Sequence, residues 1–348
     1  MDWIRGNTVG RGSSATVSVA TCCRSGNVFA AKSVEFSHSE MLQREQNILS
    51  TLSSPQIVKY MGYDITMESN KLMYNLMMEY AAAGTLHDAI RDQRGRIQES
   101  MIGQYTHQIV QGLEYLHSSG VVHCDIKCQN ILITESGAKI ADFGCAKWTS
   151  PDHPEASATM PIAGTPMFMA PEVARGEEQG SPADIWALGC TIIEMATGMS
   201  PWPNANNDPL SVLYKIAYSG ELPNFPGFLS TKAKDFLSKC LQTDPKSRWT
   251  AKQLINHPFV QEFNLSQRQN QKSFTCSPTS ILDHRAWTST EESETLDNIF
   301  VTKSSSLSRR IGGLWLNSRA PNWKWEETWI TIRENVEGVK QDKNVGGC

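Results

Sequence analysis

Apolar residues recur at two spacings along this chain of 348 residues, and the change from one to the other divides it into parts. Residues 4–60 contain short apolar runs that predict β-strands, with one stretch of helical periodicity between them. In that stretch, apolar side chains share one side of a predicted helix at Met41, Leu42, Ile48, Leu49 and Leu52. Residues 71–80 are apolar again and indicate paired strands. We therefore expect residues 3–80 to form a β-rich lobe.

Helical spacing dominates residues 81–263. One long apolar stripe ends at the helix-stop signal Ser118-Ser119-Gly120 and is made by Ile102, Tyr105, Ile109, Leu113 and Leu116. Residues 184–195 are apolar nearly all round, which predicts a buried central helix that is too short to span a membrane. The chain is therefore predicted to be an α+β protein with two lobes, the second one mainly helical.

The composition changes after about residue 264. Residues 264–348 are rich in Ser, Thr, Asn and Gln, contain few aliphatic residues and have nearly balanced acids and bases, which predicts a largely disordered tail. Its exceptions are four large apolar rings at Trp315, Trp323, Trp325 and Trp329. Two interpretations stay open: loose packing against the helical lobe, or a regulatory or docking segment with a partner of unknown kind.

Composition narrows the class of protein. The formal charge of −4 and the pI of about 6.1 do not favour a nucleic-acid partner. No apolar run reaches the roughly 18–20 residues of a membrane span, and the N-terminal residues show neither a signal-peptide run nor a myristoylation glycine. The nine cysteines are odd in number and scattered, which is typical of free thiols in a reducing compartment. We expect a cytoplasmic or nuclear protein.

The chemistry is concentrated in eight residues, His123 to Asn130, between an apolar helical run and an apolar strand. Such polar loops display functional groups on rigid scaffolds. This loop holds a carboxylate at Asp125, an ammonium at Lys127 and an amide at Asn130. Its histidine and two cysteines also resemble a partial zinc site, but no second Cys/His pair stands nearby, so ordinary loop residues are the better interpretation.

A second carboxylate, Asp142, follows Asn130 by twelve residues and begins Asp142-Phe143-Gly144. A short apolar strand separates them, so Asp125 and Asp142 can face each other across a hairpin-like turn. This set suits metal-assisted phosphoryl transfer. Asp125 would accept the proton of the attacking hydroxyl, Asp142 and Asn130 would hold Mg²⁺, and Lys127 would neutralise developing phosphate charge.

A glycine-bearing loop precedes these motifs in the chain. Such loops let backbone N–H groups approach phosphate oxygens, and this one is made by Val9, Gly10, Arg11, Gly12, Ser13, Ser14, Ala15, Thr16 and Val17. Alone the signal is weak, because glycine turns are common in hairpins, and Ala15 replaces the third glycine of G-x-G-x-x-G. With both aspartate motifs present, Lys32 is better interpreted as a phosphate-pairing lysine than as an edge charge.

Lys32 needs an acidic partner, and two glutamates on the following helix are candidates. Ser37 and Glu40 have the spacing of a capping box, which gives Glu40 a structural role. Glu45 lies on the inward apolar stripe, where a lone carboxylate would be costly without a cation. We therefore predict an ion pair between Lys32 and Glu45.

Together, the spacings H-x-D-x-K-x-x-N and D-F-G resemble those of the protein kinases over about residues 3–263. Gly164-Thr165-Pro166, with Lys127 two residues after Asp125, resembles the serine/threonine class. The amino-acid sequences of residues 4–12, 142–147 and 164–172 are similar to those of the plant mitogen-activated protein kinase kinase kinases of the MEKK-like group. The resemblance implies ATP and Mg²⁺ as cofactors and MAP kinase kinases as substrates, in stress or hormone signalling.

The resemblance also implies roles for individual residues. Thr165 joins the catalytic set, Glu172 of Ala170-Pro171-Glu172 pairs with Arg248, and Asp184 caps the catalytic loop's backbone. ATP contacts, besides residues 9–17, fall on Ala30, Lys32, Met78, Glu79 and Ala81. Cys124 stands where many kinases carry an arginine that grips a phosphate on the activation segment, so we expect weaker dependence on phosphorylation there.

Two rival functions remain: a serine/threonine kinase with an unrelated substrate, and a pseudokinase scaffold without turnover. The second is disfavoured because Lys32, Asp125, Asn130 and Asp142 are all present.

Overall fold

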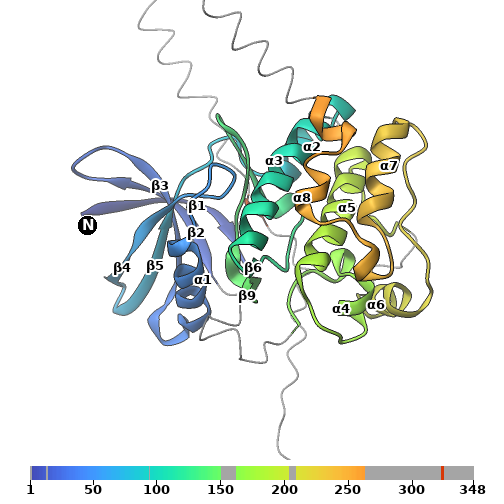
Figure 1. The fold of residues 1–348 in the computed structure, drawn as a ribbon. Helices are drawn as coiled ribbons and strands as arrows, with labels where there is room; N and C mark the ends of the chain where they lie inside the picture. The colour runs from blue at the N-terminus through green and yellow to red at the C-terminus, as the bar shows by residue number, and fades with distance from the viewer. Residues whose placement is uncertain are drawn as a thin grey trace, which may run out of the picture.

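The computed structural model describes residues 2–12, 15–93, 95–149, 162–203 and 209–262, and the two-residue strand 323–324. The chain folds into a sheet-rich lobe and a helical lobe (Figure 1). The predicted α+β, two-lobed fold is confirmed. The predicted disordered tail, 264–348, lies outside the described residues except for that short strand.

The first lobe is built on one sheet with strand order β10-β1-β2-β3-β5-β4. Neighbouring strands are antiparallel, apart from β10 (Trp323–Lys324), which lies parallel to β1 opposite Gly10 and Arg11. The other strands are β1 (Trp3–Arg11), β2 (Thr16–Cys22), β3 (Val28–Glu35), β4 (Tyr60–Glu68) and β5 (Lys71–Met78). Residues 71–80 thus supply one strand rather than a pair, because the partner β4 precedes them and joins β5 through Ser69 and Asn70, both at positive φ.

Helix α1 (Glu40–Thr51) packs against this sheet with its predicted apolar face. Two details differ from expectation. Ser37 lies in a 3₁₀ turn (Phe36–His38) and Ser39 is the N-cap residue, so the predicted capping box between Ser37 and Glu40 is wrong. Met41 is 38% exposed rather than inward-facing. The extra 3₁₀ turn delays the helix start, and sequence spacing alone does not reveal such a turn.

The second lobe is mainly helical, as predicted. Its helices are α2 (Leu86–Asp92), α3 (Glu99–Ser118), α4 (Pro171–Ala174), α5 (Ser181–Thr197), α6 (Pro209–Tyr218), α7 (Thr231–Cys240) and α8 (Ala251–Leu254). Short strands and 3₁₀ turns carry the polar motifs: β6 (Val121–Val122), η2 (Cys128–Asn130), β7 (Ile131–Thr134), β8 (Gly137–Ile140), η3 (Phe143–Cys145), β9 (Lys147–Trp148), η5 (Pro166–Phe168) and η6 (Pro245–Ser247).

The predicted central helix is α5, which lies amid the other helices of this lobe (Figure 1). Fourteen of its residues, Ala183 to Ala196, are buried. Pro182 stands in its first turn and Gly198, with φ 68°, ends it, which is the usual placement of proline and glycine at helix ends. In the part of the chain that the structure describes, no helix is both long enough and apolar enough to cross a membrane.

Candidate active site

A lysine shared by two carboxylates joins the two lobes. Lys32 on β3 donates to Glu45 Oε2 at 2.6 Å and to Asp142 Oδ1 at 2.8 Å. Glu45 is therefore the acidic partner of Lys32, as predicted, and Glu40 lies exposed at the start of the same helix. Lys32 and Glu45 come from the first lobe and Asp142 from the second. Both contacts of Lys32 therefore require that α1 packs close to β3 and that the two lobes lie close together.

The environment shifts the pKa values of all three groups. Burial alone lowers the pKa of Lys32, but Asp142 and Glu45 outweigh it and raise that pKa above its ordinary value. Burial raises the pKa of Asp142, yet the Lys32 ammonium more than offsets this and lowers it to about 2. For Glu45, burial dominates and raises the pKa against the opposing effect of Lys32. Lys32 thus stays charged, and Asp142 is its more strongly ionised partner.

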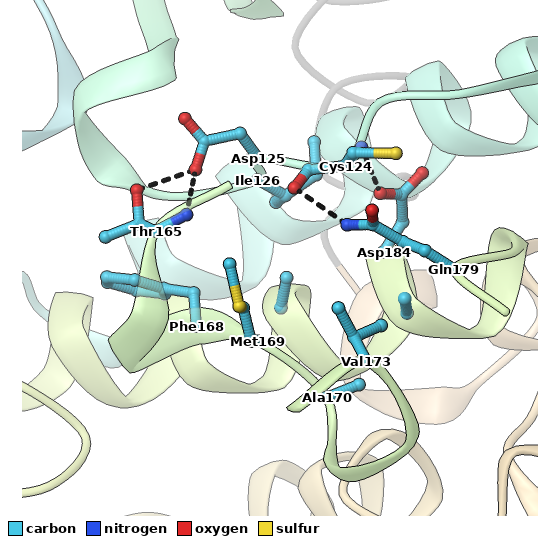
Figure 2. A pocket seen from close by; sticks show the side chains of 12 residues that line it. Cys124, Asp125, Ile126, Thr165, Phe168, Met169, Ala170, Val173, Gln179 and Asp184 are labelled. Carbon is cyan, nitrogen blue, oxygen red and sulfur yellow. Dashed lines mark hydrogen bonds between the residues drawn. The ribbon is translucent and has the colours of Figure 1, made fainter. Parts of the chain in front are cut away.

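The loop at 123–130 places its polar groups around one carboxylate. Asp125 accepts from the Thr165 hydroxyl at 2.7 Å and its backbone N–H at 3.0 Å (Figure 2). The other oxygen of Asp125 accepts from Asn130 Nδ2 at 2.9 Å and lies 3.0 Å from Lys127 Nζ. Lys127 also donates to the Thr165 hydroxyl at 2.7 Å. The structure thus brings together Asp125, Lys127, Asn130 and Thr165, which the sequence analysis singled out.

The geometry around Asn130 and Asp142 fits a hard divalent cation. The carbonyl oxygen Oδ1 of Asn130 is buried and has no hydrogen-bond partner among the residues that the structure describes, and a buried polar atom of this kind calls for an explanation such as a bound ligand. Asp142 is ionised and 29% exposed in its side chain. Carboxylate and amide oxygens are ligands that Mg²⁺ prefers. Asp142 and Asn130 are therefore the residues that would hold the ion.

Backbone conformation presents Asp142. Its φ of 62° is left-handed, and its carboxylate accepts from the Gly144 N–H at 3.4 Å. A Cβ on Gly144 would lie 3.3 Å from Asp142 Oδ1 and 3.5 Å from Glu45 Oε2. The glycine therefore leaves room for the two carboxylates and Lys32 to approach one another.

A buried aspartate anchors the catalytic loop from behind, as the sequence predicts. Asp184, in the first turn of α5, accepts from the backbone N–H groups of His123 at 2.9 Å and Cys124 at 2.8 Å. Its third partner, His117 Nε2 at 2.9 Å, stands at the end of α3 and was not predicted. Hydrogen bonding from these groups lowers the pKa of Asp184 even though burial opposes it. The loop is thus held by a carboxylate that stays charged.

The cysteines of the loop are structural. The Cys124 thiol donates to the Val122 carbonyl at 3.7 Å, and the Cys128 thiol donates to the Thr191 carbonyl at 3.8 Å. Burial raises the pKa of both thiols well above the ordinary value, so neither forms a thiolate readily. Among the described residues, no group of three His, Cys, Asp or Glu side chains is arranged to hold a metal.

The predicted nucleotide residues that the structure describes lie on β1, β2, β3 and β5, between β1 and β2, and directly after β5. Within the loop 9–17, β1 and β2 supply both arms and Gly12 N–H bonds to the Ala15 carbonyl at 2.9 Å, while Ser13 and Ser14 lie outside the described residues. Ala30 pairs with Met78 across β3 and β5, and both side chains are buried, as is Ala81. The carboxylate of Glu79 pairs with Lys139 at 2.7 Å, which ties the connector to β8.

The end of the activation segment is fixed by a buried ion pair. Arg248 donates to Glu172 Oε1 and Oε2, both at 2.6 Å, and both residues are buried. Arg248 also donates to the carbonyl oxygens of Gln242 and Pro182. The pair implied by the resemblance is present, in the bidentate geometry of a strong Arg–carboxylate contact.

One positioning residue escaped the sequence analysis. Gln179, in the stretch before α5, donates to the Ala163 carbonyl at 2.9 Å and to the Cys124 carbonyl at 3.4 Å. It thereby ties the activation segment to the catalytic loop (Figure 2). A lone glutamine in Glu177-Glu178-Gln179-Gly180 carries no sequence signal for this role; only its burial, at 5% exposure, reveals it.

Comparison with known proteins identifies the class of protein to which this site belongs. The family model described as Protein kinase domain matches residues 3–260. The chain is therefore a protein kinase, and a protein kinase acts with ATP and a divalent metal.

The curated relatives narrow the class further. Mitogen-activated protein kinase kinase kinase 18 of Arabidopsis thaliana is 49% identical over 347 residues, which cover 96% of this chain and 100% of that protein. Mitogen-activated protein kinase kinase kinase 17 is also 49% identical, with 97% and 95% covered, and number 20 is 36% identical, with 96% and 100% covered. The chain belongs to this family as a serine/threonine kinase of the MAP kinase kinase kinase type.

Proposed function

We propose that this kinase transfers the γ-phosphate of ATP to serine or threonine residues of MAP kinase kinases, in stress or hormone signalling. The observation that carries the proposal is a pair of contacts: Lys32 binds Asp142 across the two lobes, and Asn130 binds Asp125 within the catalytic loop. The substrate class is supported by the names of the relatives, mitogen-activated protein kinase kinase kinases 18 and 17 of Arabidopsis thaliana.

Each residue has a definite task in this proposal. Bound Mg²⁺ would neutralise phosphate charge, held by Asp142 and Asn130. Lys32, placed by Glu45, orients the nucleotide phosphates, and residues 9–17 cover them with backbone N–H groups. Asp125 accepts the proton of the substrate hydroxyl, and Lys127 stabilises charge beside it. Ala30, Met78, Glu79 and Ala81 enclose the adenine.

Thr165 would act as a positioning residue in the same proposal. Its hydroxyl bridges Asp125 and Lys127, at 2.7 Å from each. It therefore holds the base and the cation at the distance that a substrate hydroxyl would need. A serine at this position keeps the hydroxyl, so Thr165→Ser should preserve more activity than Thr165→Val.

The test is radiolabel transfer from ATP to a panel of kinase-dead substrate proteins that includes MAP kinase kinases. Wild type should label a MAP kinase kinase, and Lys32→Met and Asp125→Asn should not, with the melting temperature of each variant measured so that transfer is assayed where the variant is folded. Labelling of other panel proteins only would favour an unrelated substrate. Equal labelling by wild type and Asp125→Asn would exclude the proposed base, and no transfer by wild type would favour a scaffold.

We further propose that activity depends little on phosphorylation of the activation segment. Cys124 offers only a buried, neutral thiol where a phosphate-gripping arginine would be needed. Thr149 lies next to the undescribed stretch 150–161, which holds Ser150, Ser157 and Thr159. We expect the purified kinase to keep most of its kcat after phosphatase treatment, measured with mass-spectrometric proof of dephosphorylation. Abolished activity would contradict the idea.

A cytoplasmic or nuclear location is also proposed. It rests on the scattered free thiols, since the seven described cysteines are all unbridged. Imaging of a tagged full-length chain would test it.

A further inference from the structure

A cavity lies on the helical lobe, away from the catalytic loop. Its volume is about 470 Å³, and it opens between the end of α3, the start of α5 and the start of α8. These three helices lie together on this lobe (Figure 1). A volume of this size is in the range of sites that hold a small ligand or several side chains.

The cavity combines an apolar part with two exposed ammonium groups. The partly buried Pro182 and Trp249 supply apolar surface, and Lys246 and Lys252 are exposed at its border. Glu114 is the single carboxylate that lines it. Such a lining suits an extended segment that carries both acidic and apolar side chains.

The wall of the cavity is connected to the active site. His117 lines it and bonds to Asp184, which holds the catalytic loop. Arg248 also lines it and holds Glu172 at the end of the activation segment. An occupant would therefore contact residues that are one hydrogen bond away from both anchors.

The chain itself contains a complementary segment. Residues 291–301 read Glu-Glu-Ser-Glu-Thr-Leu-Asp-Asn-Ile-Phe-Val, with four carboxylates in the first seven positions. No Lys or Arg occurs between residues 286 and 302. Of the tail's ten carboxylates, counted over residues 263–348, four thus fall in this short stretch.

Chain length allows the segment to reach the cavity. The described lobe ends at Glu262, only ten residues after Lys252 of the cavity border. The 28 residues from 263 to 290 then separate the lobe from the acidic run. A flexible chain of this length has a root-mean-square span of about 30 Å. The tether would hold the segment near the cavity at an effective concentration on the order of millimolar.

We propose that this cavity binds residues 291–301 of the same chain, with the acidic side chains on Lys246 and Lys252 and with Leu296, Ile299 or Phe300 against Trp249 and Pro182. Exposed ion pairs are weak individually, so the tether and the apolar contacts supply the rest of the affinity. Because the charge contacts are at the surface, salt should weaken the docking.

Zero-length carbodiimide cross-linking of the purified full-length chain tests this directly. At low salt, peptide mapping should find amide bonds from Lys246 or Lys252 to Glu291, Glu292 or Glu294 in the monomer fraction. The double variant Lys246→Glu with Lys252→Glu lacks both amines and cannot form this product, so it serves as the background for the charge swap. Adding Glu291→Lys, Glu292→Lys and Glu294→Lys to that variant should restore a link between the swapped charges.

Arg24→Glu is the matched control, because Arg24 is an exposed cation of the first lobe, 85% exposed in its side chain. It should leave the yield within about twofold of wild type. The proposal fails if the acidic run links equally to lysines all over the surface, if the links join different chains, or if the swapped charges restore nothing. It also fails if 0.5 M salt leaves the yield unchanged. None of these outcomes depends on kinase activity.

Discussion

At the scale of single residues, Gly164 decides how closely the activation segment approaches the catalytic loop. Its φ of 121° is open only to glycine at little cost, and an added Cβ would overlap the backbone carbonyl oxygen of Cys124. That oxygen belongs to the loop that positions Asp125. The next residue, Thr165, bonds to Asp125 directly, so any shift at Gly164 reaches the base.

We therefore expect Gly164→Ala to lower kcat by about 10²-fold, the usual cost of displacing reacting groups by about an ångström. Gly176→Ala is the matched control. Its φ is 84°, but an added Cβ would meet no atom within 4 Å. It should cost about 1–2 kcal/mol of stability and leave kcat within about twofold. Steady-state kinetics and urea denaturation measure both effects, and equal kcat values for the two variants would contradict the steric argument.

At the scale of elements, α4 is fixed to the turn before α8 by Glu172 and Arg248. Both residues are buried, and two hydrogen bonds join them. Because charges in such a place are desolvated, the pair is weak evidence for net stabilisation, but removal of one partner leaves the other uncompensated. The two elements are 76 residues apart in the chain, so the pair holds the tertiary arrangement rather than a local turn.

We predict that Glu172→Gln lowers the free energy of unfolding by about 3–5 kcal/mol. The control is Arg175→Ala, which removes a pair with Glu177 whose side chains are 31% and 54% exposed. That loss should be about 1 kcal/mol or less. Urea denaturation of both variants at one pH provides the comparison. A smaller loss for Glu172→Gln than for Arg175→Ala would show that the buried arginine finds other partners.

At the scale of the whole molecule, the two lobes meet through the charges of the active site. Lys32 and Asp142 lie 2.8 Å apart across the lobes. The lowered pKa of Asp142, about 2 against an ordinary 3.8, makes this contact a source of stability that depends on pH. The stabilisation is complete above about pH 5 and is lost as the pH falls through 3.8 toward 2, because the unfolded chain then takes up a proton that the folded carboxylate does not.

The stability advantage of wild type over Asp142→Asn should consequently narrow by about 1 kcal/mol between pH 6 and pH 3. Urea denaturation at both pH values, without nucleotide, measures it. Parallel curves, with the same difference at pH 6 and pH 3, would mean that Asp142 is not held by Lys32 in solution.

The tail provides the second prediction at this scale. Every residue of the proposed mechanism precedes residue 265 in the chain. Deletion of residues 265–348 should therefore keep kcat with a generic protein substrate within about threefold of the full chain. Melting temperature and kcat should be measured together. Loss of ATP turnover with an intact melt would make the tail part of the catalytic unit.

Much of the fold and of the site follows from local pattern. Strand and helix periods predicted both lobes, and the inward position of Glu45 predicted its pairing with Lys32, because a buried carboxylate requires a cation. The capping box at Ser37 failed because a 3₁₀ turn competes with the helix start. The prediction of paired strands within residues 71–80 was wrong, because this range forms the single strand β5. An apolar run shows that a strand exists but not where its partner lies.

By itself, then, the sequence determined the kinase class, the two lobes and the identity of the reactive groups, since these depend on residue type and spacing. Only the tertiary structure decided which remote residues form hydrogen bonds: Gln179 donates to the Cys124 carbonyl, and His117 bonds to Asp184. It also decided that a cavity lies beside Lys246 and Lys252. The physical reason is that hydrogen bonds and cavities form between residues that are remote in the chain, and their distances are set by packing rather than by local pattern.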